Sequence, residues 1–363
     1  MRCQKKITGV TLVELLIAMA ISSVLLVGVG SIYSNTKRTY FVQDEFGLLQ
    51  ENARYALDVL TKEIRNAGYI GCKSLSLLSP NSIVTNAGAF GGVDFTPQNF
   101  ILGHTNSGGV TNPPFPSPSA NIEANTDGLT IRRASSCGGH LTGNTDPNNA
   151  NVQLTSNCGF KQNEIVMITD CQSADIFKIT NNPNDNGGNN AITLAHSNAG
   201  NTTNKLSKIY GNSATIFKLE RNTYFIKTDP VSGNPSLYVR GLMSQGGAYG
   251  VFENQIADNV ESMLIDYGVD LDFVQDSDST EVGADTYLTT PQIEALGINP
   301  LNSNATLWAS VVNLRIRLLM RSNPVSNRVR KYDWNGATVT PAAGDYRIRQ
   351  AYTVTINLRN RTP

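Results

Sequence analysis

The sequence is poor in charged residues. Only 16% of its 363 residues are charged, whereas an average soluble domain has roughly 25%. Lys plus Arg number 29 and Asp plus Glu also number 29, so the formal net charge is zero. That balance argues against a nucleic-acid binder that works through a broad basic surface. The composition also excludes a highly charged disordered chain and a membrane protein with many spans.

Common catalytic motifs are missing as well. The chain contains no G-x-S-x-G, H-E-x-x-H or P-loop sequence. Its three histidines, His104, His140 and His196, lie far apart among small and polar residues, which predicts surface or loop positions. The sequence therefore offers no candidate catalytic residue and implies no cofactor.

A long apolar run lies close to the N-terminus. The first nine residues contain three cations and no acid, and the next 24, from Val10 to Tyr33, contain one charge, Glu14. As a helix this run would be about 36 Å long, enough to cross a bilayer core of about 30 Å. The cations before it predict that the N-terminal end stays in the cytoplasm while the rest of the chain crosses.

A secretory signal peptide and a plain signal anchor are the ordinary explanations of such a run. A signal peptide has an apolar core of about 7–15 residues and a small-residue cleavage site. Here the run is longer and no clear Ala-x-Ala follows it. A plain anchor does not explain Glu14, because a carboxylate inside the bilayer costs roughly 2.5–3.5 kcal/mol on insertion scales and is usually retained for a partner.

The sequence Lys-Lys-Ile-Thr-Gly followed by Val-Thr-Leu-Val-Glu-Leu-Leu-Ile-Ala resembles the class III leader of type IV prepilins. In that family a prepilin peptidase on the cytoplasmic face cuts after the glycine and N-methylates the new first residue. The resemblance implies cleavage between Gly9 and Val10, N-methylation of Val10, and a mature chain whose fifth residue is Glu14. The family usually has Phe at the first mature position, so Val10 is a departure that can alter the efficiency of processing.

Cleavage would also give Glu14 a natural partner. The new α-amino group at Val10 is cationic at neutral pH, and a carboxylate five positions into the chain can pair with the ammonium group of a neighbouring subunit. Removing one partner of a buried ion pair leaves an uncompensated charge and costs roughly 3–5 kcal/mol. We therefore expect Glu14 to set the axial register between subunits.

An amphipathic pattern continues the apolar run. Apolar residues recur at helical spacing from Phe46 to Ala67, and Gly68 and Gly71 provide stop signals, which predicts one helix over residues 10–67. The junction LLQENARYALDVLTKEIRNAGYIGC closely resembles that of the PilW-type minor pilins. So do the later segments NVESMLIDYGVDLDF, VVNLRIRLLMRS and TVTINLRNR. The J-type secretion pseudopilins share much of this layout.

The remainder of the chain predicts a mainly antiparallel β-sheet domain with long loops, packed on the helix in an α+β fold. Glycines and prolines between Cys72 and Asp127 predict loops. Hardly any helical period follows Gly68. Short β-branched runs predict strands at residues 128–134, 164–169, 175–180, 237–240, 258–267, 310–321 and 346–358. Residues 214–219 and 223–227 are typical of a hairpin that turns at residues 220–222.

The chain thus divides into four expected regions. They are a leader peptide at 1–9, a transmembrane helix at 10–33, an amphipathic continuation at 34–70 and a periplasmic or extracellular β-rich domain at 71–363.

Four of the five cysteines would remain after cleavage, because Cys3 lies in the leader. An even number in an oxidising compartment predicts two disulfides with three possible connectivities. We favour Cys72–Cys137 and Cys158–Cys171, because the second would bridge a short strand excursion. Metal binding is the rival, but Cys137-Gly-Gly-His140 is a single Cys-x-x-His without a second pair at ligand spacing.

A cluster of acids gives a partial match to a Ca²⁺ loop. Only its Asp-x-Asp start has the alternating spacing of such a loop, and the glycine and final glutamate of an EF-hand are missing. A solvated acidic loop is therefore the better interpretation. The cluster comprises Asp270, Asp272, Asp276, Asp278 and Glu281.

The resemblance implies a minor pilin that takes part in type IV pilus assembly, in an initiation or tip complex. Its expected partners are the prepilin peptidase, other minor pilins, the major pilin and the assembly platform of the inner membrane. It would begin as a single-pass inner-membrane protein with a periplasmic domain and end in the pilus at the cell surface. A domain of about 290 residues is bulky for a repeating shaft subunit, which favours a position at the tip.

Two other functions stay open at this point. One is a J-type minor pseudopilin of a type II secretion system. The other is a pilus-tip adhesin or DNA-uptake subunit, although the overall charge argues against DNA. A local basic strip keeps the DNA alternative open, and it consists of Arg315, Arg317, Arg321, Arg328, Arg330 and Lys331.

Overall fold

A computed structural model gives the structure of the chain in two compact units. Unit 1 consists of Met1–Gln50 and Ser322–Arg349, and unit 2 of Glu51–Arg321 and Gln350–Pro363. The structure describes residues 9–71, 78, 80–85, 99–107, 110–112, 115, 121–145, 149–156, 158–183, 192–245, 248–271, 283–300, 302–325 and 328–360.

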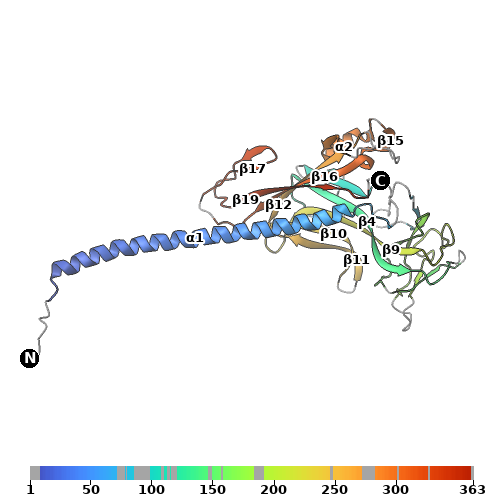
Figure 1. Ribbon diagram of the computed structural model, residues 1–363, viewed down its shortest axis with the longest axis horizontal. Helices are drawn as coiled ribbons and strands as arrows, with labels where there is room; N and C mark the ends of the chain where they lie inside the picture. Colours follow the sequence, from blue (N-terminus) through green and yellow to red (C-terminus); the bar gives the residue numbers. More distant parts are fainter. Residues whose placement is uncertain are drawn as a thin grey trace, which may run out of the picture. The chain divides into compact units, whose positions relative to one another are not determined.

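Helix α1 spans Leu12–Arg65 and supplies residues to both units (Figure 1). The observed helix falls within the predicted span of 10–67. Its end follows from local chemistry, since Gly68 and Gly71 have φ angles of 70° and 103°, a backbone region that favours glycine. The Gly68 N–H then donates to the Arg132 carbonyl at 2.9 Å, so the end of the helix is bound to a strand far away in sequence.

The two halves of α1 have different surroundings. In the first half the apolar side chains are exposed, among them Leu25 and Leu26 at 63% and 72%. In the second half Ala56, Leu60 and Ile64 are completely buried. Their spacing of four residues places them on one face of the helix, as expected for a helix that packs on a soluble domain.

The larger sheet lies in unit 2 and has the strand order β1-β7-β6-β9-β4-β2-β3, with β10 paired to β9 and β11 to β10. Its neighbours are antiparallel except for β1 and β7, which are parallel. The strands are β1 (Asn81–Ser82), β2 (Ile101–Ser107), β3 (Val110–Asn112), β4 (Thr126–His140), β6 (Ile165–Thr169), β7 (Ala174–Lys178), β9 (Thr215–Thr228), β10 (Pro235–Gln245) and β11 (Ala248–Ala257).

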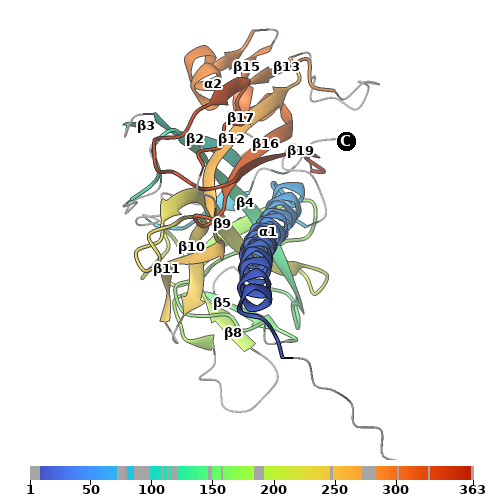
Figure 2. The ribbon, with the colours of Figure 1, turned by 90° about the vertical axis from the view of Figure 1, so that its left-hand side faces the viewer.

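A second sheet has the order β13-β12-β16-β19. Its strands are β12 (Val260–Val269), β13 (Thr286–Leu288), β16 (Val311–Arg321) and β19 (Arg349–Asn357). Small elements complete the fold: β5 (Asn151–Leu154) with β8 (Ile192–Ala195), β14 (Ile298–Asn299) with β15 (Asn302–Thr306), β17 (Tyr332–Trp334) with β18 (Ala337–Val339), helix α2 (Thr290–Leu296) and a 3-10 turn at Leu307–Ser310. The predicted α+β class is confirmed (Figure 2).

Buried polar groups join these elements within unit 2. The Asp127 carboxylate of β4 accepts a hydrogen bond from the Ile265 N–H of β12 at 2.8 Å and another from the Thr105 hydroxyl of β2. Burial raises the pKa of Asp127. The Arg133 guanidinium of β4 contacts the carboxylates of Glu63 on α1 at 3.1 Å and Glu220 on β9 at 2.6 Å. The second half of α1 is therefore tied to the larger sheet by charge as well as by apolar burial.

Three sequence-based expectations about local structure were wrong. Residues 214–227 form no hairpin, because β9 runs straight through Glu220, whose carboxylate pairs with Arg133 on the neighbouring strand. Strands β2 and β3 occupy part of the segment predicted as loops. Helix α2 was missed because it is a single short element, which begins with a capping box of Thr289 and Gln292.

Candidate functional site: the N-terminal end of helix α1

The helix begins with a reciprocal capping arrangement. The Thr11 N–H and hydroxyl both donate to the Oε2 atom of Glu14, at 2.9 and 3.0 Å. In return the Glu14 N–H donates to the Thr11 Oγ1 atom at 3.3 Å. This is a capping box, in which side chains at the N-cap and three residues later satisfy backbone donors that the first turn leaves open. A carboxylate in the first turn also interacts favourably with the helix dipole.

The sequence contains the signal for this cap, which is Thr-x-x-Glu before an apolar run. Glu14 was predicted as a residue for pairing between subunits. The structure adds that the same carboxylate has a partner inside its own chain. Both hydrogen bonds go to Oε2, so the Oε1 atom remains able to accept a further donor.

Gly9 and Val10 precede the helix and are both exposed. No atom would lie within 4 Å of a Cβ added at Gly9. The peptide bond between them is therefore sterically accessible, just before the N-cap. The eight residues before Gly9 lie outside the described residues, so cleavage at this bond and methylation of Val10 stay predictions.

The following turns of α1 are long and apolar enough to cross a membrane, and α1 is the one helix of this kind among the described residues. No part of the chain that the structure describes buries its most apolar stretch. Gly28 and Gly30 lie on this part of the helix, and an added Cβ would meet no atom within 4 Å at either. An exposed apolar surface of this extent must be covered by lipid or by other chains.

The cysteines fall partly outside the described region. Cys158 and Cys171 both take part in disulfide bonds, and Cys158 packs against the apolar cluster that contains Phe160. Cys72 and the side chain of Cys137 lie outside the described residues. The pairing, including the proposed Cys158–Cys171 bridge, therefore stays a prediction. Among the described residues no group of three or more His, Cys, Asp or Glu side chains could hold a metal ion.

The prediction of surface or loop positions for the histidines was wrong for His104. His104 on β2 is 1% exposed, stacks on Phe115 and has its Nε2 atom 2.7 Å from the Thr130 Oγ1 atom. His196 lies in the loop after β8, as predicted, but it is only 2% exposed, and burial lowers its pKa. Polar neighbours in sequence do not reveal burial, because alternate residues of a strand face opposite sides. His140 is exposed, as predicted.

Neither the acidic cluster that begins at Asp270 nor the basic strip from Arg315 to Lys331 forms a single binding site among the described residues. Asp270 is buried, and the other four acids of its cluster lie outside the described residues. In the basic strip Arg317 pairs with Asp266 at 3.0 Å, and the Arg315 guanidinium lies 3.9 Å from the centre of the Tyr287 ring. Arg328, Arg330 and Lys331 belong to unit 1, whereas Arg315, Arg317 and Arg321 belong to unit 2.

Two protein families match separate parts of the chain. The type IV pilus-assembly protein W family matches residues 223–360, from the second half of β9 to the end of the described region. The prokaryotic N-terminal methylation motif matches residues 4–30, which include the capping box and most of the apolar half of α1. No curated protein and no solved structure matches the chain.

The two matches agree with the structure that surrounds them. The methylation motif falls on the exposed apolar helix and implies processing by a prepilin peptidase and assembly with other pilus proteins in general. The assembly family falls on the strands of the β-rich domain and consists of structural and assembly proteins. Together the two matches, one at each end of the chain, support a PilW-type, prepilin-like minor pilin of type IV pilus assembly.

Proposed function

We propose that this minor pilin enters the complex that initiates the pilus and lies near the pilus tip. The observation that carries the proposal is the exposed apolar half of α1, with one carboxylate held in its first turn. Such a surface is suited to helix packing against other subunits as it leaves the bilayer. The size of the β-rich domain supports a terminal position, because a subunit at one end escapes the packing limit of a repeating shaft.

Maturation would begin at Gly9. A prepilin peptidase on the cytoplasmic face cuts between Gly9 and Val10 and then methylates the Val10 amine. The new N-terminus lies one residue before Thr11, so the capping box with Glu14 is retained in the mature chain. The helix therefore needs no rearrangement of its first turn after cleavage.

Glu14 would then set the axial register between neighbouring subunits. Its Oε2 atom keeps the Thr11 hydrogen bonds, while Oε1 accepts a hydrogen bond from the Val10 ammonium group of a neighbour. Thr11 acts as a positioning residue, because its two hydrogen bonds hold the carboxylate near the helix start. A buried charge without its partner costs roughly 3–5 kcal/mol, so registers that leave Glu14 without an ammonium group are disfavoured.

The proposed location follows the chain from the N-terminus. Residues 10–33 span the inner membrane, with the N-terminus in the cytoplasm. The helix continues at residues 34–70 into a periplasmic domain at 71–363. The specific partners are other minor pilins, the major pilin and the assembly platform, and the protein reaches the cell surface as part of the pilus.

Replacement of Glu14 tests the proposal. Glu14→Ala should remain in the membrane at the wild-type level but be lost from sheared pili, since a subunit without the carboxylate leaves its neighbour's ammonium group unpaired. Glu51→Ala is the matched control, because Glu51 is an exposed carboxylate on the same helix beyond the apolar run. Immunoblots of membrane and sheared-pilus fractions, normalised to the major pilin, measure both quantities.

Glu14→Gln separates charge from capping, because the amide oxygen can still accept the Thr11 hydrogen bonds. If it behaves like Glu14→Ala, the negative charge is required. Wild-type amounts of Glu14→Ala in sheared pili would contradict the pairing role.

A further inference from the structure

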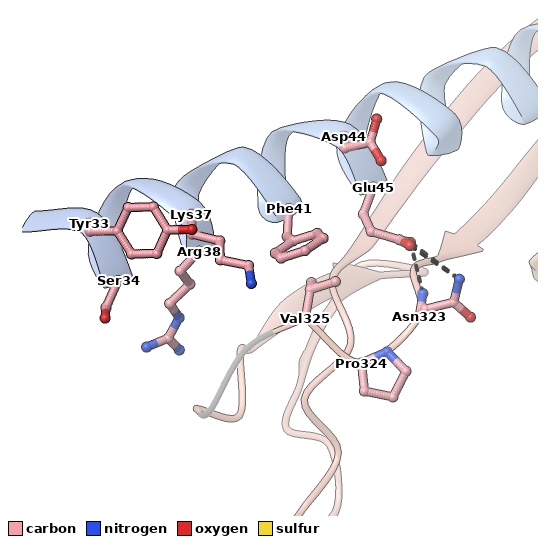
Figure 3. Close-up of a pocket in the computed structure, with 10 residues that line it drawn as sticks. All are labelled: Tyr33, Ser34, Lys37, Arg38, Phe41, Asp44, Glu45, Asn323, Pro324 and Val325. Carbon is pink, nitrogen blue, oxygen red and sulfur yellow. Dashed lines mark hydrogen bonds between the residues drawn. The ribbon is translucent and has the colours of Figure 1, made fainter. Parts of the chain in front are cut away.

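Unit 1 contains a groove of about 660 Å³ immediately after the apolar run. One wall is the part of α1 that carries Tyr33, Lys37 and Phe41, and the other is the loop at Pro324 and Val325 (Figure 3). Its volume lies within the range of pockets that hold small ligands, which is about 300–1,000 Å³.

The far wall of this groove is fixed in place. The Glu45 carboxylate of α1 accepts hydrogen bonds from the Asn323 N–H at 3.1 Å and from the Asn323 Nδ2 atom at 3.2 Å (Figure 3). One residue earlier, the Ser322 N–H donates to the Ile348 carbonyl at 2.9 Å. The loop is therefore anchored at its start, and the groove is a defined feature of this unit.

The charges of the groove are unevenly placed along the helix. Lys37 and Arg38 line the end nearest the apolar run, about 6 Å beyond Tyr33 along the helix axis. Asp44 and Glu45 line the other end, about 10 Å further along. Glu45 already accepts the two donors of Asn323, and Figure 3 shows Asp44 directed away from the loop.

Lys37 and Arg38 follow directly after the apolar run, which determines where they would lie relative to a membrane. If residues 10–33 span the bilayer, Tyr33 lies at the membrane surface, where aromatic residues are enriched, and Lys37 and Arg38 lie at the level of lipid headgroups. Ser34 adds a hydroxyl donor at the same end. Arg328, Arg330 and Lys331 are exposed in the same unit, shortly after Val325 in sequence.

We propose that this groove binds the headgroup of an anionic phospholipid from the outer surface of the inner membrane. Lys37 and Arg38 donate to the phosphodiester oxygens, and the Ser34 hydroxyl lies at the same end of the groove. Phe41 and Val325 contact the glycerol carbons next to the phosphodiester. The bound lipid would hold unit 1 at the membrane surface until the subunit is extracted into the pilus. This inference rests on the proposed span of residues 10–33.

The test measures lipid retention by the full-length protein in detergent, so it is independent of pilus assembly. Native mass spectrometry would follow binding of phosphatidylglycerol and of phosphatidylcholine with the same acyl chains. We expect preferential retention of phosphatidylglycerol by the wild-type protein, and roughly tenfold weaker retention after Lys37→Gln with Arg38→Gln. The matched control is Arg54→Gln with Lys62→Gln, which removes two exposed cations from the same helix farther from the apolar run and should leave retention unchanged.

A second variant tests the groove itself. Val325→Glu keeps both cations but places a carboxylate on the opposite wall, so it should also weaken retention of phosphatidylglycerol. Circular dichroism would confirm that each variant is folded. Equal retention of the two lipids, undiminished retention by the double variant, or equal losses in the control pair would each overturn the proposal. Displacement of the lipid by free glycerol phosphate at equal concentration would overturn it as well, because the site would then recognise a soluble phosphate.

Discussion

The two halves of helix α1 share one continuous backbone but depend on different surroundings. In the half from Leu12 to Tyr33 nearly every apolar side chain is exposed, whereas the half from Glu51 to Arg65 buries a full apolar stripe in unit 2. The charged groups differ in the same way. Glu14 binds only its own first turn among the described residues, but Glu63 pairs with Arg133 on strand β4.

This difference shows how one helix can serve two purposes. The second half is part of the folded domain, and its sequence is constrained by packing against that domain. Among the described residues the apolar side chains of the first half are exposed, so its apolar sequence has to be explained by contacts with lipid or with other subunits. Variants that leave one half intact and change the other should therefore separate stability from assembly.

A matched pair of leucine variants should give the largest separation. Leu60→Ala removes a completely buried side chain and should lower the free energy of unfolding of the domain by about 2–5 kcal/mol. Leu26→Ala removes a side chain that is 72% exposed and should change it by less than about 0.5 kcal/mol. Denaturant unfolding of the detergent-solubilised protein, followed by circular dichroism of the β-rich domain, measures both. A similar loss in the two variants would show that the first half also supports the fold.

A smaller effect should appear in the pH dependence of the stability of unit 2, through the carboxyl group of Asp127. Because burial raises the pKa of Asp127, its contribution to stability is fully present below its ordinary value near 4 and is lost as the pH rises through the raised value. Asp127→Asn cannot ionise and keeps an acceptor for the Ile265 N–H. As the pH rises from about 4, the wild-type protein should therefore lose unfolding free energy relative to Asp127→Asn.

The comparison with Asp127→Asn isolates this residue from other carboxylates. Asp345 in unit 1, for example, has the opposite sign. Its partial burial would raise the pKa, but hydrogen bonds from Arg349 and the Arg347 N–H lower it overall, so its contribution is lost as the pH falls below about 4. A difference between wild type and Asp127→Asn that does not change with pH would contradict the proposed titration of Asp127.

The sequence predicted those parts of the fold that depend on local pattern. The long helix follows from a continuous apolar run and a stripe with helical period, and it ends at the predicted glycines. The hairpin prediction at residues 220–222 failed because three polar residues in a row are also typical of a turn. In the structure, Glu220 lies inside β9 and is satisfied by Arg133, a residue 87 positions earlier. Such a partner cannot be recognised from local sequence.

The residues of the candidate sites also differ in whether local sequence reveals them. Gly9, Val10 and Glu14 could be found from spacing and resemblance, because the motif is short and contiguous. The capping role of Thr11 was also local and could have been predicted. The groove in unit 1 could not, because it requires Lys37 and Arg38 to lie opposite a loop almost 290 residues later in the chain. The buried positions of His104 and His196 likewise depend on partners that are distant in sequence.

The most direct test of the central claim is the intact mass of the protein recovered from a piliated cell that carries an active prepilin peptidase. The account predicts a chain that starts at Val10 and carries one methyl group on its α-amino nitrogen. A protein that still starts at Met1, or a Val10 amine without the methyl group, would contradict it.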